Sequence, residues 1–281
     1  MSNVESDRKR KEIITKGENS SYVTSYVLEL RTVQSASIKI LTEALREILN
    51  DVCLEFDETG LKLVTMDTSH VVLIHLKLDS CKFEYYQCEN RIVVGVNMLN
   101  LYKLIRTINS NDTLTLFIES ADMNHLGIKI ENGDKNTKTT YKLNLLDLDN
   151  QKISIDPAEF NTVITLPSVD FQKIIRDMNN IAETVEIKNI GTQLILSCKG
   201  DFCSQETILA DNENGSVISS KKNEIVQGIF SLKYLVLFTK CTNLCTAVEL
   251  YLKNDYPIIV QYPVSSLGFV KMCLAPLNNT Q

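Results

Sequence analysis

The sequence is poor in the residues that most enzymes and secreted proteins rely on. Its 281 residues include no tryptophan and only three histidines, so a histidine-based triad or a zinc site would have to use one of those three. The eight cysteines fall mostly inside apolar runs and never form a C-x-x-C pair, which favours buried free thiols over disulfides or zinc. Because no run of about 18 uncharged apolar residues exists and the polar N-terminus has no signal-peptide core, we expect neither a membrane span nor secretion.

Motifs of catalysis are missing as well. The chain has no G-x-S-x-G, no Walker A, no G-x-G-x-x-G and no H-E-x-x-H. We therefore predict a protein without enzymatic activity, cofactor or metal. The net charge of −6 argues against a surface coated with cations for tight, non-specific DNA binding, although it leaves room for a local basic face.

Four segments carry apolar residues at helical spacing, and the residues between them alternate as strands do. The expected N-caps of the four helices are Ser35, Asn97, Ser168 and Ser231. The first and third caps are separated by almost the same number of residues as the second and fourth, so a unit of two helices and several strands occurs twice. We predict an α+β fold of two tandem similar domains, each with two helices on antiparallel sheets.

A polar stretch with a proline, DLDNQKISIDP at 147–157, interrupts the strand pattern between the two units, as an interdomain connector does. The polar leader before the first unit holds the basic run RKRK, which suits a nuclear-import signal or a solvated tail. The predicted boundaries are a disordered leader at 1–21, an N-terminal domain at 22–146, the connector at 147–163 and a C-terminal domain at 164–281.

Each predicted helix carries two basic residues spaced to share one side, either three or seven positions apart. These candidates for a DNA-facing surface are Lys39, Arg46, Lys103, Arg106, Lys173, Arg176, Lys233 and Lys240. For any single helix a solvated face is the simpler interpretation, but the fourfold recurrence favours an organised surface. Acidic residues lie on the same helices, so we expect weak and strongly salt-dependent binding.

Five short motifs follow one another in a fixed order: MDTSHV at 66–71, LLDLD at 145–149, LPSVDF at 166–171, IRD at 175–177 and LAP at 274–276. Together they resemble proliferating cell nuclear antigen, the eukaryotic and archaeal sliding clamp of DNA polymerase. The resemblance covers residues 22–277 and fades in the leader and at 211–224. It implies a DNA-clamp fold that closes into a homotrimeric ring, with the helices lining a central hole and the sheets forming the outer wall.

The function implied by this resemblance is that of a processivity factor. Such a clamp encircles duplex DNA without reading its sequence and tethers DNA polymerase and other replication and repair proteins. The implied partners are double-stranded DNA, DNA polymerase, a clamp loader, proteins with a PCNA-interacting peptide motif and further copies of the chain, with no membrane. The implied location is the nucleus, or a cytoplasmic replication site if the chain is viral.

The resemblance also assigns two kinds of protein surface. Ring closure uses the edge strands at 139–146 and 203–210, because an open sheet edge is a template for pairing with another chain. The implied subunit-interface residues are Tyr141, Leu143, Leu145, Cys203, Gln205 and Thr207. The implied client-peptide pocket, an adaptable apolar surface, consists of Met66, His70, Val71, Leu73, Ile153, Ile155, Pro257, Ala275 and Pro276.

The chain departs from the family pattern at two places. Cys273 stands where the family usually has an aromatic residue before L-A-P, so the client preference is expected to differ. The predicted turn KNIG at 188–191 is shorter than in the family, and Lys188 is the nearest counterpart of the lysine that is modified during damage tolerance. Two alternatives stay open: a subunit of a heterotrimeric, checkpoint-type clamp, and a monomeric polymerase accessory protein that binds DNA by charge alone.

Overall fold

The computed structural model of the chain describes residues 25–149, 153, 158–160, 162–211, 215–220 and 225–277. The predicted leader, much of the predicted connector and the pocket candidate Ile155 lie outside the described residues. Within them, no helix is both long and apolar enough to cross a bilayer. The same residues contain no group of three or more His, Cys, Asp or Glu side chains arranged to hold a metal ion.

The described part of the N-terminal half contains two α-helices, as predicted. Helix α1 spans Ser35–Leu45 and helix α2 spans Met98–Ile105. The described strands of this half are β1 (Tyr26–Thr32), β2 (Asp51–Asp57), β3 (Gly60–Met66), β4 (Val72–Asp79), β5 (Tyr85–Cys88), β6 (Ile92–Asn97), β7 (Asp112–Glu119), β8 (Asp122–Asn132) and β9 (Thr137–Asn144), with the short 3-10 helix η1 (Ser80–Lys82).

The C-terminal half repeats this plan. Helix α3 spans Ser168–Asn179, helix α4 spans Leu232–Phe238, and the 3-10 helix η2 (Thr239–Leu244) follows α4 directly. The described strands are β10 (Thr162–Pro167), β11 (Thr184–Ile190), β12 (Gln193–Lys199), β13 (Ser204–Ala210), β14 (Val217–Ser220), β15 (Val226–Ser231), β16 (Ala247–Leu252), β17 (Ile258–Val264) and β18 (Gly268–Leu274).

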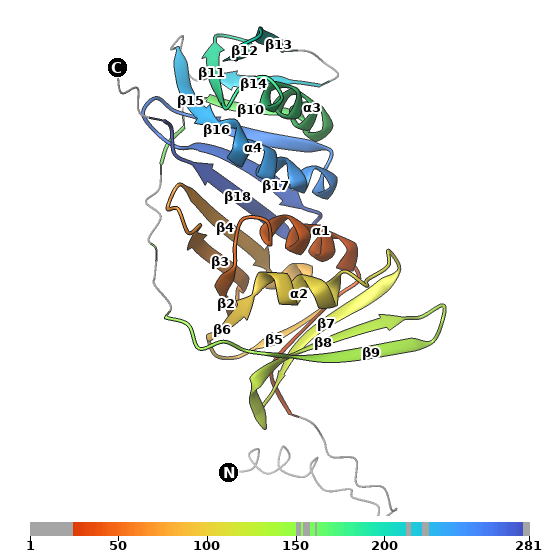
Figure 1. Ribbon diagram of the computed structural model, residues 1–281. Helices are drawn as coiled ribbons and strands as arrows, with labels where there is room; N and C mark the ends of the chain where they lie inside the picture. Colours follow the sequence, from red (N-terminus) through yellow and green to blue (C-terminus); the bar gives the residue numbers. More distant parts are fainter. Residues whose placement is uncertain are drawn as a thin grey trace, which may run out of the picture.

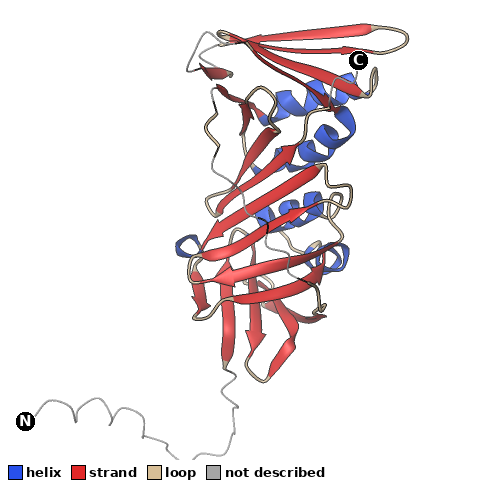
Figure 2. Cartoon of the chain, turned by 90° about the vertical axis from the view of Figure 1, so that its left-hand side faces the viewer, coloured by secondary structure: helices blue, strands red, loops and turns tan. Residues whose placement is uncertain are grey.

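The described strands pair antiparallel in three sheets. A five-stranded sheet has the order β5-β1-β7-β8-β9, and a four-stranded sheet has the order β13-β12-β11-β15. Figure 1 shows these two sheets at opposite ends of an elongated molecule, with the four α-helices along one side. Figure 2 shows the longer helices together on one side of the strands. The molecule therefore has a helical face and an opposite face made of strands.

The third sheet joins the two halves, which the sequence did not predict. Its nine strands have the order β14-β10-β16-β17-β18-β4-β3-β2-β6. Strands β18 and β4 belong to different halves and pair along their whole length, from Gly268 opposite Leu78 to Leu274 opposite Val72. Pairing between strands so far apart in sequence produces no pattern in the local sequence. The hydrophobic periodicity therefore predicted two units but not the sheet that joins them.

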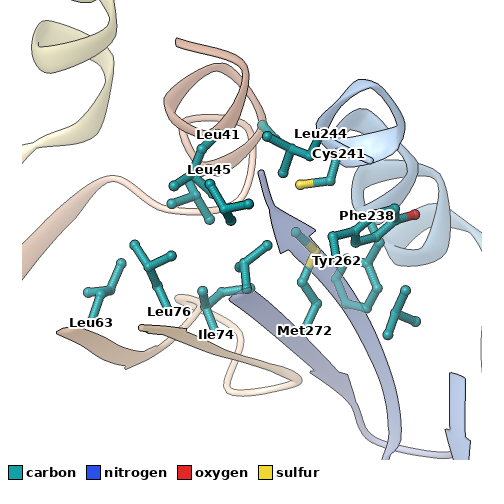
Figure 3. Close-up of a cluster of buried hydrophobic side chains, with 14 of the residues drawn as sticks. Leu41, Leu45, Leu63, Ile74, Leu76, Phe238, Cys241, Leu244, Tyr262 and Met272 are labelled. Carbon is teal, nitrogen blue, oxygen red and sulfur yellow. The ribbon is translucent and has the colours of Figure 1, made fainter. Parts of the chain in front are cut away.

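The hydrophobic core is also continuous across the halves. Leu45 of α1 and Ile74 of β4 gather with Met272 of β18 and Phe238 of α4 in one cluster of buried side chains (Figure 3), and each is at most 1% exposed. Full burial of such a side chain contributes roughly 1.5–3 kcal/mol. The two halves are consequently held as one body by apolar packing as well as by the shared sheet.

Two of the four predicted N-caps are not caps. Ser35 and Ser168 are instead the first residues of α1 and α3, where their side chains are buried. The Ser35 hydroxyl donates to the carbonyl of Asp112, and the Ser168 hydroxyl donates to the carbonyl of Cys245. The prediction that serine marks the start of these helices is correct. Each hydroxyl, however, bonds a distant carbonyl instead of a helix amide, and local sequence preference cannot predict such a tertiary contact.

The other two predicted caps are confirmed in position. Asn97 precedes α2, and its side chain accepts a hydrogen bond of 3.0 Å from the backbone amide of Asn100. Ser231 precedes α4 in an extended conformation, without a side-chain hydrogen bond to the helix. Only the Asn97 side chain therefore acts as a cap in the expected way.

The predicted turn at 188–191 is mostly strand. Lys188 pairs with Ile195, and β11 continues to Ile190, so that only Gly191 and Thr192 connect it to β12. Gly191 has a φ of +58°, the left-handed conformation that a tight hairpin turn requires. Lys188 is accordingly a half-buried strand residue rather than a turn residue.

All eight cysteines are free thiols, as predicted. Six are buried or half-buried, but Cys81 and Cys203 are exposed. Cys203 lies in the short turn before β13, where the Gly200 amide donates to the Cys203 carbonyl at 2.9 Å. The expected burial is therefore wrong at these two positions, since Cys81 lies in η1 and Cys203 in a turn, and neither lies in a strand.

Candidate functional site

Six of the eight basic residues predicted to face DNA are exposed. They are Lys103, Arg106, Lys173, Arg176, Lys233 and Lys240. Helix α3 presents Lys173 and Arg176 on one side, because residues three positions apart lie on the same helical face, and Lys103 of α2 has the same spacing to Arg106, which directly follows α2. Lys240 differs from the expectation: α4 ends at Phe238, and Lys240 falls in η2, so the predicted seven-residue spacing within one α-helix does not hold there.

The other two predicted cations hold the N-terminal half together. Lys39 of α1 donates a hydrogen bond of 2.8 Å to the carbonyl of Ile108, just beyond α2. The equivalent residue of α3 is Gln172, which donates at 2.9 Å to the carbonyl of Thr239, just beyond α4. The same structural bond is thus made by a charged residue in one half and by a neutral one in the other.

Arg46, immediately after α1, is similarly engaged. Its guanidinium carbon lies 4.3 Å from the ring centroid of Tyr102 in α2, and its Nη2 lies 2.8 Å from the carboxylate of Glu47. A stacked cation of this kind contributes about 0.5–1 kcal/mol. The basic side chains of α1 therefore support the packing of α1 on α2, whereas those of α2 and α3 are exposed.

Two sheet edges are open in the way that the predicted subunit interface requires. Strands β9 and β13 are terminal strands of their sheets, and each has one hydrogen-bonded neighbour among the described strands. Strand β9 ends at Asn144, two residues before the predicted end, and Leu146 forms an isolated bridge to Gly95 instead. Strand β13 begins at Ser204, which leaves Cys203 in the turn.

The interface candidates that lie in or next to these two strands are half-buried, with the exception of the exposed Cys203. On β9, Tyr141 and Leu143 are half-buried and pack on the core, as does Leu145 just beyond it. On β13, Gln205 and Thr207 are half-buried and alternate with exposed neighbours. Strand β9 carries two lysines and no acid, and β13 carries one glutamate and no base. Both lysines of β9 already lie near acids of the neighbouring strands: Lys142 is 2.9 Å from Glu119, and Lys138 is 3.8 Å from Glu131.

A row of side chains on four neighbouring strands builds the floor of the predicted client pocket. Met66 of β3 lies opposite Leu73 of β4, Leu73 lies opposite Cys273 of β18, and Cys273 lies opposite Ile259 of β17. Directly opposed antiparallel residues project to the same face. These four side chains are therefore neighbours on the outer face of the nine-stranded sheet, and all four are at least partly exposed.

Burial raises the pKa of the Cys273 thiol to about 11, although the nearby Lys271 opposes the shift. Cys273 therefore stays a neutral thiol at physiological pH. Here the chain offers a small, weakly polar surface between Leu73 and Ile259 in place of the aromatic ring that the resemblance led us to expect.

The structure divides the remaining pocket candidates between two cavities. Met66, His70 and Ile153 line a cavity of about 330 Å³ beside the start of the connector. Pro276 lines a larger cavity of about 780 Å³ between the C-terminal tail, β15 and the loop before β17. Three further candidates do not line these two cavities. Val71 and Ala275 are joined to each other, since the Val71 carbonyl accepts a 3.2 Å hydrogen bond from the Ala275 amide. Pro257 is half-buried just before β17.

The turn between β3 and β4 is organised by one buried carboxylate. Asp67 is 7% exposed, and its Oδ1 accepts hydrogen bonds from the amides of Val71 and Val72 at 2.9 and 2.8 Å. Its Oδ2 accepts from the amide and the hydroxyl of Ser69. Burial alone would raise the pKa of Asp67, but these hydrogen bonds lower it below its ordinary value. The carboxylate substitutes for the glycine or proline that a tight turn usually contains.

The connector is attached at both ends by residues that the sequence reasoning missed. At its start, the Leu146 amide donates 2.8 Å to the Gly95 carbonyl, and a Cβ on Gly95 would lie 2.2 Å from the Leu146 oxygen. At its end, Phe160 packs edge-on against Tyr251 and Tyr256, with ring centroids 5.5 and 5.6 Å apart. Phe160 had a usable signal, since it stands as an isolated aromatic among polar residues.

Two similar α+β units joined through one sheet, with helices along one side and open edge strands at both ends, define the class of DNA clamps. Comparison with known proteins names the family. Models of the N-terminal and C-terminal domains of proliferating cell nuclear antigen match residues 27–152 and 154–277, so the chain belongs to this family. It is 38% identical over 255 residues to a protein of Paramecium bursaria Chlorella virus 1 named as a probable DNA polymerase sliding clamp 1, covering 89% of this chain and 97% of that protein.

Proposed function

We propose that the chain is a non-catalytic DNA polymerase processivity factor, whose copies close into a trimeric ring around duplex DNA. The observation that carries this proposal is the pair of open edges, β9 and β13, at opposite ends of the molecule (Figure 1). Contact between unlike edges is heterologous, and such contacts generate closed rings when the rotation per subunit closes.

The helical face supports an interior that holds DNA loosely. The six exposed cations on the described helices supply contacts to phosphate, which position a duplex without reading its bases. The acidic balance of the whole chain keeps such contacts weak. Weak contact suits a ring, because topological enclosure keeps the clamp on DNA and tight binding would slow its movement.

The outer face supports the docking of client peptides. The row from Met66 to Ile259 and the two cavities beside it form a partly apolar surface next to the connector. Flexible methionine and aliphatic side chains suit several partners of modest affinity. The proposed partners are DNA polymerase, a clamp loader and other replication or repair proteins that carry an aromatic-anchored helical motif, acting where the DNA is replicated, in the nucleus or at a viral replication site.

The test has two stages. Light scattering on the purified protein should give three times the chain mass of 31.8 kDa. The protein loaded on nicked circular DNA should then resist high salt until the circle is cut. A mass of one chain at all concentrations would contradict the homotrimer and favour the hetero-oligomeric or monomeric alternatives. A binder acting by charge alone would leave the uncut circle, losing roughly a thousandfold in affinity over a fourfold salt range if it neutralises six phosphates.

A further inference from the structure

The docking turn of the N-terminal half touches a helix of the C-terminal half. The Ser69 hydroxyl oxygen lies 2.9 Å from the hydroxyl oxygen of Tyr234, which belongs to α4. Ser69 and Tyr234 are 165 residues apart in sequence. This contact reaches the turn that follows Met66 and contains His70, both residues of the proposed pocket.

The direction of this hydrogen bond follows from the groups involved. A serine hydroxyl has one proton, and the Ser69 hydroxyl donates it to the carboxylate of Asp67, which is an acceptor only. Tyr234 must therefore be the donor toward Ser69. The result is a chain from the Tyr234 hydroxyl through the Ser69 hydroxyl to a buried carboxylate, in which the charged acceptor polarises both links.

The two elements joined by these hydrogen bonds, helix α4 and the turn between β3 and β4, differ in how firmly they are packed. The Tyr234 ring packs on the core, and α4 is anchored by Leu232 and Leu235, both 0% exposed. The turn, in contrast, holds His70 at a φ of +57°, a conformation that costs a non-glycine residue free energy. A firmly packed element of one half thus holds a strained turn of the other half.

We propose that Tyr234 is a positioning residue for client docking: its hydroxyl, acting through Ser69, fixes the conformation of the turn that presents Met66 and His70 to a bound peptide. This inference rests on the proposed function, since it concerns the same client surface. Loss of the Tyr234 hydroxyl leaves the turn's bonds to Asp67 in place but removes the donor from the C-terminal half. The turn then samples more conformations in the free protein, and ordering it on binding lowers the affinity for the client peptide.

The test uses the full-length chain and a fluorescent synthetic peptide with an aromatic-anchored helical motif. Tyr234→Phe keeps the ring and removes the hydroxyl, and we expect it to weaken peptide binding roughly fivefold, the change that loss of about 1 kcal/mol gives. Ser69→Ala should weaken binding at least as much, while Ser69→Thr keeps a hydroxyl and should restore it. Tyr26→Phe is the matched control, because the Tyr26 ring packs on Phe117, and its hydroxyl makes no hydrogen bond within the described part of the chain.

A double-mutant cycle decides between positioning and packing. If Tyr234 acts through Ser69, Tyr234→Phe has no further effect on peptide affinity in the Ser69→Ala background. Equal effects in both backgrounds, or wild-type affinity of Tyr234→Phe, would overturn the inference. Failure of the wild-type chain itself to bind the peptide would instead contradict the proposed client surface. A thermal midpoint measured for every variant separates loss of affinity from loss of folded protein.

Discussion

The two halves of the molecule hold their two helices together with hydrogen bonds at equivalent positions, but partly through different side chains. In both, the first residue of the leading helix is a serine whose hydroxyl bonds a carbonyl beyond the second helix. In both, the fifth residue of that helix also bonds a carbonyl just beyond the second helix, but this residue is Lys39 in one half and Gln172 in the other. The position is thus structural in both halves, and the charge of Lys39 is incidental to its bond.

This comparison changes how the basic residues are to be interpreted. By sequence, Lys39 and Arg46 look equivalent to the pairs on the other helices. In the structure they hold α1 on α2, whereas Lys173 and Arg176 of α3 are exposed and form no ion pair within the described residues. The halves also differ at their edges, since one half supplies the basic strand β9 and the other the acidic strand β13.

The largest effect is expected from a change at the acidic edge. Ile208 of β13 is 53% exposed, and Ile208→Lys would place a cation on the edge that is proposed to meet the basic strand β9. A cation buried in an interface without a partner costs several kcal/mol, so the trimer should dissociate to single chains in light scattering. Val217→Lys is the matched control, since Val217 is 57% exposed on β14, an edge strand outside the proposed interface, and it should keep the trimer mass. A trimer that survives Ile208→Lys would remove β13 from the interface.

The next largest effect concerns DNA binding by the two leading helices. The Lys173→Ala, Arg176→Ala double variant should reduce the slope of log affinity against log salt by about 0.9 for each phosphate that the variant no longer neutralises, measured on a short duplex by fluorescence anisotropy. Lys39→Gln should leave the slope unchanged, because the Lys39 ammonium already bonds the Ile108 carbonyl. If Lys39→Gln lowers the slope as much as the α3 variant does, the proposed difference between the halves is wrong.

The turn at Asp67 should show the third effect. Asp67→Asn removes charge from a buried acceptor of four hydrogen bonds, and we expect a loss of about 2 kcal/mol in the free energy of unfolding by urea denaturation. Since the folded pKa of Asp67 is lowered, its contribution is present above the ordinary aspartate pKa of about 3.9 and is lost as the pH falls through the folded pKa. Asp134→Asn, an exposed turn residue, serves as the control. A stability equal to that of the wild type would show that the turn does not depend on the carboxylate charge.

The smallest effect compares the two equivalent bonds directly. Lys39→Ala and Gln172→Ala should each cost about 1 kcal/mol in the free energy of unfolding, because each leaves a carbonyl beyond a helix without its donor. Lys39→Gln should cost less than Lys39→Ala, since an amide at the equivalent position makes the same bond in the other half. Unequal losses for the two alanine variants would mean that the bonds are not equivalent.

Much of the fold was predictable because its patterns are local. Strand alternation, helical spacing and hairpin turns gave two α+β units with two helices each, and the positions of all four α-helices are confirmed. The candidate surfaces were predictable only by resemblance, and the structure adds the strand registers that bring Leu73 and Cys273 together. Gly95 was missed because its role depends on what packs against it and not on its neighbours in sequence, whereas Phe160 was missed although its isolation in the sequence was a signal.

The sequence by itself determined the elements, their order and their repetition, since each depends on residues a few positions apart. The tertiary structure decided the rest: the pairing of β18 with β4, the hydrogen bond from Lys39 to the Ile108 carbonyl, and the hydrogen bond between Ser69 and Tyr234. These contacts join segments that are distant in sequence. Which acceptor a hydroxyl or an ammonium group bonds depends on which groups lie next to it in the folded protein. Their energies depend on burial and geometry that exist only after the two halves have closed on one another.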